Sequence, residues 1–92
     1  MGKKISVTRK HGLGLEGATG KLVELTETFA EKYNLKTKLS GTAVEVSGSG
    51  VKGNVRVTAD AVVIDLDLGL PASLVAGKIE DGIQRQLEKY FG

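Results

Sequence analysis

The sequence predicts an α+β protein: a two-layer fold in which a five-stranded, mainly antiparallel sheet carries two helices on one face, in the order β-α-β-β-β-β-α. Apolar residues alternate with polar residues in five segments, as they do in half-buried strands. In two other segments they recur every three or four positions, as on the buried side of a helix. Because only short links separate the four middle segments, neighbouring strands should pair antiparallel. We expect residues 1–92 to form a single domain.

A change in the spacing of the apolar residues predicts a first strand followed by a first helix. Ile5 and Val7 alternate with polar residues over 4–9, and from Leu13 the period becomes helical as far as residue 33. Asn34 stands where a left-handed residue commonly ends a helix, and Leu35 is placed to fold back on the last turn. The expected apolar stripe consists of Leu15, Ala18, Leu22, Leu25, Phe29 and Tyr33.

The middle of the chain predicts four short strands joined by tight turns at Ser40-Gly41, Gly48 to Gly50 and Ala59-Asp60. Residues two apart share one side of a strand, so one residue in two should face the helices. The residues expected on that inner side are Leu35, Thr37 and Leu39 in the first strand, Val44 and Val46 in the second, Val51, Gly53, Val55 and Val57 in the third, and Val62, Ile64, Leu66 and Leu68 in the fourth.

Pro71 is expected to open the second helix, where its missing N–H costs nothing. Gly77 and Gly82 each weaken such a helix by up to about 1 kcal/mol relative to alanine. A close approach of this helix to the sheet would account for both glycines. The expected stripe consists of Ala72, Val75, Ile79, Ile83, Leu87 and either Tyr90 or Phe91.

Composition excludes several kinds of function. There are no cysteines, so disulfides, thiolate metal sites and cysteine nucleophiles are excluded. The formal net charge of +2 is too small for a strong field toward nucleic acid. No apolar stretch has the length of a secretory signal or of a membrane span. We therefore expect a soluble, cytoplasmic protein with no transmembrane segment.

Two glycine-rich stretches resemble nucleotide-binding motifs. GSGVKG, residues 48–53, has the spacing of a dinucleotide fingerprint, but the alternation that follows it predicts a strand where the fingerprint needs a helix. A hairpin turn explains Gly48 and Gly50 better, because both can adopt positive φ. GLGLEGATGKL contains Gly20-Lys21, but it lacks the glycine and the hydroxyl residue of a phosphate loop. An anion bound at this helix start, near Lys21, stays an alternative.

His11, Asp65 and Asp67 are the side chains with the best claim to chemistry. A lone histidine could serve as a general base or a pH switch, but a residue hydrogen-bonded to local backbone is the more usual role. The two aspartates share one side of a strand and could form an acid–base pair. We interpret them as part of a solvated face, with Lys4, Lys52 and Arg56 as cross-strand partners. The sequence therefore assigns no catalytic residue, no cofactor-binding residue, no cofactor and no metal ligand.

The outer side of the sheet should be polar. It has no aromatic residue for base stacking, which disfavours nucleic-acid binding, whereas protein–protein contact or homo-oligomer formation through the sheet stays open. Its expected members are Lys4, Ser6, Thr8, Lys36, Lys38, Glu45, Lys52, Asn54, Arg56, Val63, Asp65 and Asp67.

One family resemblance covers nearly the whole chain. Its matching segments are HGLGLEGA, FAEKYNL, GSGVKGNVRV and LGLPASLVAGKIEDGIQRQLEKYF, in that order. In these segments the chain resembles the putative polyhydroxyalkanoic acid system proteins, or polyhydroxyalkanoate granule-region proteins. It departs from them at Leu39, where relatives often carry an aromatic residue. The resemblance implies a bacterial cell and a link to storage-polyester synthesis or granules, and it brings no catalytic residue.

Three functions are therefore considered. The first is a non-enzymatic accessory protein of the polyhydroxyalkanoate system that binds a granule-associated protein or the polyester granule surface. The second is a carrier of a small hydrophobic or acyl ligand held between the helices and the sheet, where Gly53, Gly77 and Gly82 could make room. The third and least favoured is an enzyme acting on hydroxyacyl substrates, with His11 or the aspartates as base.

Overall fold

The structure is a computed structural model that describes residues 2–70 and 72–91. The chain runs through β1 (Lys3–Lys10), α1 (Gly14–Tyr33), β2 (Lys36–Ser40), β3 (Ala43–Gly48), β4 (Val51–Val57), β5 (Ala61–Leu68), a short 3-10 helix η1 (Ala72–Val75) and α2 (Ala76–Phe91). This is the predicted order, with η1 added before the second helix. The predicted helix start at Pro71 lies outside the described residues.

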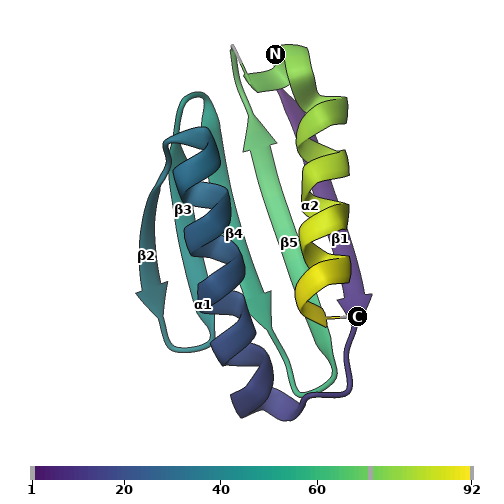
Figure 1. Cartoon of the computed structure of the whole chain (residues 1–92). Helices are drawn as coiled ribbons and strands as arrows, with labels where there is room; N and C mark the ends of the chain where they lie inside the picture. Colours follow the sequence, from purple (N-terminus) through teal and green to yellow (C-terminus); the bar gives the residue numbers. More distant parts are fainter. Residues whose placement is uncertain (1, 71, 92) are drawn as a thin grey trace.

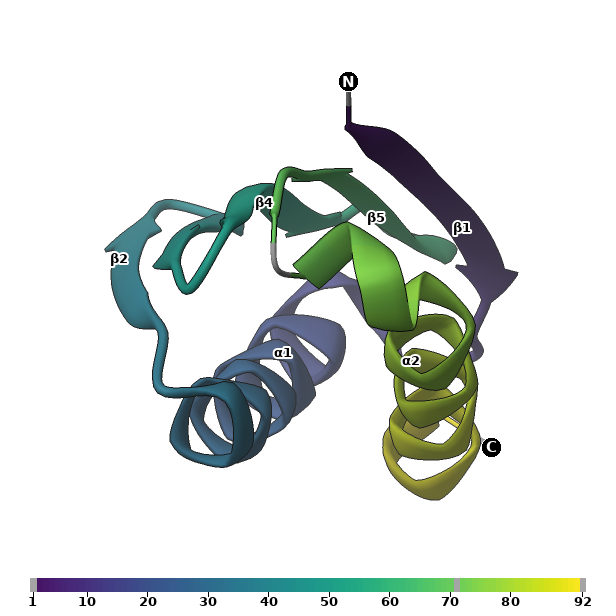
Figure 2. The same ribbon diagram turned by 90° about the horizontal axis from the view of Figure 1, so that it is seen from above.

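The five strands form one antiparallel sheet in the order β1-β5-β4-β3-β2. Figure 1 shows the strands and both helices running along the same long direction. Figure 2 shows that both helices lie on one side of the sheet, which arches over them. The predicted two-layer α+β arrangement is therefore confirmed, and no element of the described residues covers the other side of the sheet.

The core lies between the sheet and the helices. Most of the residues predicted to face inward are buried, and burial of roughly 1.5–3 kcal/mol per large apolar side chain is what holds the two layers together. The largest of the fully buried side chains are Leu22 of α1, Val62, Ile64 and Leu68 of β5, and Ile79 and Leu87 of α2. No helix of the described residues is long and apolar enough to cross a membrane.

Four residues predicted to be inside are exposed. Leu15 and Val75 keep 44% of their surface, and Leu39 keeps 55%. Thr37 is exposed as well. Leu15 and Val75 lie at the outer ends of the helical segments, and Thr37 and Leu39 lie on β2, the strand at one edge of the sheet. Periodicity predicts which side of an element faces inward, but it does not predict how far the opposite layer extends.

The predicted ends and turns are largely confirmed. Asn34 adopts the left-handed conformation (φ 56°), and the N–H of Leu35 donates to the carbonyl oxygen of Ala30 at 2.9 Å. The β3–β4 link is a two-residue turn in which Ser49 and Gly50 both have positive φ, so GSGVKG is a hairpin. The β2–β3 turn is shifted by one residue from the prediction, because Ser40 pairs with Ala43 and leaves Gly41 and Thr42 as the loop.

The interpretation of three glycines was wrong. A Cβ on Gly53 would meet the main chain of Asp65 and Leu66 on β5, so this glycine permits close approach of two strands and opens no room inside. A Cβ on Gly77 would meet no atom within 4 Å. A Cβ on Gly82 would lie 3.2 Å from the hydroxyl of Tyr33. Gly82 therefore faces α1, and neither helical glycine brings α2 close to the sheet.

Candidate functional site

His11 is held by the backbone around it. Its Nε2 lies 3.0 Å from the carbonyl oxygen of Thr58, and the N–H of Leu13 donates to its Nδ1 at 3.2 Å. A carbonyl can only accept, so Nε2 carries the proton and Nδ1 is the acceptor. The ring also lies 5.8 Å from that of Phe91. Both ring nitrogens are thus used to join the start of α1 to the β4–β5 turn, as the structural interpretation of His11 predicted.

Asp65 and Asp67 are each matched with a different basic residue. Asp65 accepts from Arg56 Nη1 at 3.0 Å and from the Ser6 hydroxyl at 2.9 Å, and Asp67 lies 4.0 Å from Lys4 Nζ. These are exposed cross-strand contacts of the kind predicted for a solvated face. Within residues 2–70 and 72–91, no three side chains of the metal-binding types lie together.

The space between helices and sheet is too small for a carried ligand. The enclosed volume beneath Leu25, Phe29 and Ile83 is about 10 Å³, whereas pockets for small molecules usually measure about 300 Å³ or more. The side-chain amide oxygen Oε1 of Gln86 is buried beside this space and has no hydrogen-bond partner among the described residues. A cavity of this size accommodates one water molecule at most. The acyl-carrier hypothesis, in the form that places the ligand between the layers, is wrong.

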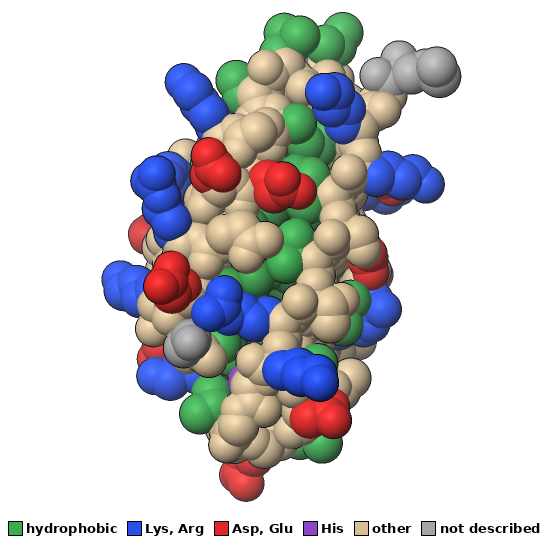
Figure 3. Space-filling view, turned by 90° about the vertical axis from the view of Figure 1, so that its right-hand side faces the viewer, with side chains coloured by type: hydrophobic (Ala, Val, Ile, Leu, Met, Phe, Trp, Pro, Cys, Tyr) green, Lys and Arg blue, Asp and Glu red, His purple; other side chains and the backbone are tan. Residues whose placement is uncertain are grey.

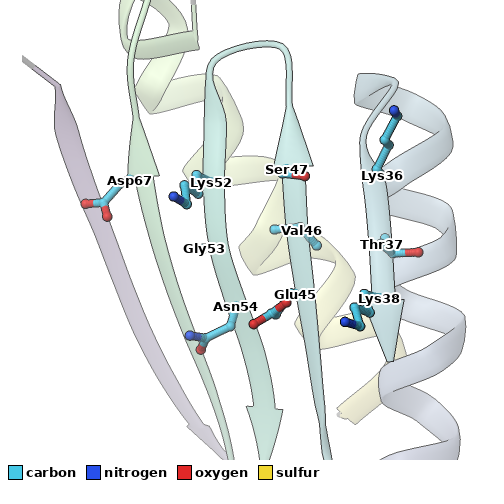
Figure 4. A pocket seen from close by; sticks show the side chains of 10 residues that line it. All are labelled: Lys36, Thr37, Lys38, Glu45, Val46, Ser47, Lys52, Gly53, Asn54 and Asp67. Carbon is cyan, nitrogen blue, oxygen red and sulfur yellow. The ribbon is translucent and has the colours of Figure 1, made fainter. Parts of the chain in front are cut away.

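The uncovered side of the sheet carries polar side chains in cross-strand rows, and we call it the open sheet face. One row contains Lys36, Ser47, Lys52, Asp67 and Lys4, and the next contains Lys38, Glu45, Asn54, Asp65 and Ser6. Between the two rows lies a hollow of about 530 Å³, shown in Figure 4. The hollow is lined by Lys36, Thr37, Lys38, Glu45, Val46, Ser47, Lys52, Gly53, Asn54 and Asp67.

Three lysines of the hollow are free of ion pairs. In the described part of the chain, no carboxylate lies within 4.0 Å of Lys36, Lys38 or Lys52. The sequence predicted Lys52 as a partner of the aspartates, but Arg56 and Lys4 take that role. The hollow is lined by these three lysines and by two carboxylates, Glu45 and Asp67, so it presents a small excess of positive charge on β2 and β4.

The end of the molecule near η1 is apolar. Leu70 and Leu74 keep 73% and 76% of their surface, and Val75 keeps 44%; we call these three residues the apolar tip. Figure 3 shows apolar side chains forming this end of the molecule. A groove of about 310 Å³ lies beside the tip, with almost only apolar surface around it. It is lined by Tyr33, Ser49, Val51, Ala72, Leu74, Val75 and Ile79.

The apolar tip was not predicted from the sequence. The apolar residues after Pro71 were assigned to one helical stripe, and Leu70 and Leu74 fall outside that stripe. Leu74 is a large apolar residue outside the helical stripe, and Leu70 continues the two-residue period of β5 beyond the last residue of that strand; these two features are the signal that could have found the tip. Such residues have no predicted place in the core, so they are candidates for an exposed contact surface.

Comparison with known proteins agrees with the resemblance seen in the sequence. A family model described as putative polyhydroxyalkanoic acid system protein matches residues 5–91, from β1 to the last residue of α2. None of the curated proteins matches the chain.

Proposed function

We propose that this chain, which belongs to the family described as putative polyhydroxyalkanoic acid system proteins, is a non-enzymatic accessory protein of that system and binds the polyester granule surface through its apolar tip. The observation that carries the proposal is the exposure of Leu70 and Leu74, which the core does not use. A granule of storage polyester offers an apolar phase in water. The tip is the part of the described surface best suited to such a phase.

The energetics favour reversible binding. Burial of a leucine side chain contributes roughly 1.5–3 kcal/mol, so transfer of Leu70 and Leu74 contributes about 3–6 kcal/mol before the cost of lost freedom. Val75 and the groove beside it add further apolar area. A contact of this size holds a protein at a surface only when the surface is abundant, as a granule is within its cell.

A non-catalytic role is supported by the hydrogen bonds and ion pairs that already engage His11, Asp65 and Asp67. General-base action by His11 requires a free ring nitrogen, and both of its nitrogens already bind backbone atoms. Asp65 and Asp67 are each paired with a different basic residue on the open sheet face.

The proposal is tested by co-sedimentation with purified granules. The double variant Leu70→Ser/Leu74→Ser should lose most of its granule-bound fraction, because the apolar contact is removed without touching the core. The matched control is Leu13→Ser/Leu39→Ser, which removes two exposed leucines from the opposite end of the molecule (44% and 55% exposed). This control should sediment as the wild type does, and equal loss in both variants would contradict a specific role of the tip.

A second arm separates the granule surface from a granule-associated protein. Particles of pure polyester carry no protein, so binding to them requires direct contact with the polymer surface. Binding to native granules alone would transfer the role of the tip to a protein partner. If the wild type binds neither, the accessory function proposed here should be abandoned.

A further inference from the structure

The open sheet face and helix α1 carry net charges of opposite sign. The open side of the strands carries six basic residues (Lys4, Lys10, Lys36, Lys38, Lys52 and Arg56) and three acidic ones (Glu45, Asp65 and Asp67), whereas Lys3 and Arg9 share the inner side of β1 with Ile5 and Val7. Helix α1 contains four glutamates and two lysines. At about 100° per residue, Glu16, Glu24, Glu27 and Glu31 fall within an arc of about 80°; we call them the acidic stripe. All four are exposed.

The acidic stripe lies on the side of α1 opposite its buried residues. The buried residues of α1 are Ala18, Leu22, Leu25, Thr26 and Phe29, and the centre of that set lies about 180° around the helix from the centre of the stripe. One side of the two-layer molecule therefore exposes a row of glutamates, and the other side exposes the lysines of the hollow.

The two charged surfaces also lie in line with each other. Helix α1 packs against β2, β3 and β4 from the inside, and Figure 2 shows it beneath these strands. The hollow lies on the outside, mainly on the same three strands. A second copy displaced along the normal to the layers, without rotation, would therefore set its acidic stripe over the hollow of the first.

The spacing of the charges matches along the strands. Lys36 and Lys38 are about 6.8 Å apart on β2, and Glu27 and Glu31 are about 6 Å apart along the axis of α1. Glu27 and Glu31 belong to the second half of α1, and Lys36 and Lys38 to the first part of β2; Figure 1 shows the last turn of α1 and the start of β2 toward the end of the molecule where α2 begins.

We propose that the open sheet face binds the acidic stripe of α1 of a second copy, head to tail. The contact is heterologous, since the two surfaces that meet are different parts of the chain, and translation does not close it into a ring. The product is an open stack whose length grows with protein concentration. This inference does not depend on the apolar tip or on the granule.

The test is sedimentation velocity over a range of protein concentrations at two ionic strengths. Exposed ion pairs are weak and screened, so the association should appear at about 0.01 M salt and be lost near 1 M, where the Debye lengths are about 30 Å and 3 Å. At low salt the average mass should rise with concentration above the 9.7 kDa of one chain. A mass that stays at one chain at every concentration overturns the proposal.

Charge reversal identifies the surfaces. Lys36→Glu/Lys38→Glu and Glu27→Lys/Glu31→Lys should each weaken the association roughly tenfold, because each turns attractions into repulsions. An equimolar mixture of the two should associate again, since reversed lysines of one variant meet reversed glutamates of the other. Failure of the mixture to recover overturns the pairing of these two surfaces.

Matched variants on α2 control for net charge. Lys78→Glu/Lys89→Glu and Glu80→Lys/Glu88→Lys change the net charge by the same amounts on exposed positions of the other helix. Both variants should associate as the wild type does, and an equimolar mixture of the two should associate no more strongly than either variant alone. If they behave like the variants of the hollow and the stripe, association follows net charge and the proposed contact is wrong. Far-UV circular dichroism establishes that each variant is folded.

Discussion

Replacement of Gly53 by alanine should destabilise the protein by about 2 kcal/mol. Gly53 lies in the middle of β4, paired with Val46 on β3 and Leu66 on β5. An added methyl group would stand 2.8 Å from Leu66 Cα and 3.0 Å from the main-chain carbonyl carbon of Asp65. These are backbone atoms of a paired strand, so they cannot turn aside as a flexible side chain can, and β4 has to separate from β5.

The magnitude combines two opposing effects. Overpacking of a tight site costs typically 1–3 kcal/mol, and a clash with backbone belongs near the upper end of that range. Alanine is better than glycine inside a strand by roughly 0.5–1 kcal/mol, which offsets part of the cost. A net loss of about 2 kcal/mol should lower the Tm of a chain this small by about 8–16 °C.

Thermal and urea unfolding followed by far-UV circular dichroism measure this effect. Gly77→Ala is the matched control, because its new methyl group meets no atom within 4 Å. This control should be neutral or up to about 1 kcal/mol more stable than the wild type, through helix propensity. If Gly53→Ala is as stable as the wild type while Gly77→Ala behaves as expected, the close approach of β4 and β5 at Gly53 is refuted.

Three further substitutions test the core, a helix end and an ion pair. Leu87→Ala removes a side chain with no exposed surface and should cost about 2–5 kcal/mol by urea unfolding, whereas a loss under about 1 kcal/mol would contradict the packing described. Asn34→Ala should cost about 1–2 kcal/mol because of its left-handed backbone, and Asn34→Gly should cost little; equal losses would argue against that backbone. Arg56→Ala should cost less than about 1 kcal/mol, and the difference should vanish at about 1 M salt, because its pair with Asp65 is exposed.

Periodicity was sufficient to predict the strands of the sheet, because burial of one face requires an apolar side chain at every second residue. On β5, Val62, Ile64, Leu66 and Leu68 are all nearly inaccessible, as predicted from alternation alone. The hairpin at Ser49-Gly50 was predictable for a related reason: two adjacent positions with positive φ need residues that tolerate it. Local chemistry and strand period agree there, so a nucleotide fingerprint could be rejected without a structure.

The exposure and pairing of surface side chains could not be predicted, because they depend on contacts between residues that are distant in the sequence. Leu39 continues the period of β2, yet it is exposed because no element packs over that part of the edge strand. Lys52 was equally plausible as a partner of Asp65 or Asp67, and only the register and side-chain positions assign those roles to Arg56 and Lys4. The apolar tip lies where the chain leaves β5. Its exposure depends on which other elements reach that end of the molecule, and the local sequence pattern does not contain that information.

Surface binding and stacking, if both occur, should reinforce each other. Copies related by translation along the layer normal keep their long axes parallel, so all apolar tips lie along one edge of the stack. A surface that binds one weak tip would then bind many tips at once, and the avidity should exceed that of a single tip by a large factor.

The variant Glu27→Lys/Glu31→Lys tests this coupling, because it leaves Leu70 and Leu74 untouched. Its binding to polyester particles should fall at protein concentrations where the wild type stacks, and it should recover when Lys36→Glu/Lys38→Glu is added in equal amount. The two variants change the net charge in opposite directions, so simple attraction to a charged particle would raise the binding of one while lowering that of the other. Loss in both with recovery in the mixture is explained only by contact between copies. Binding of both variants at the wild-type level would mean that each tip acts alone.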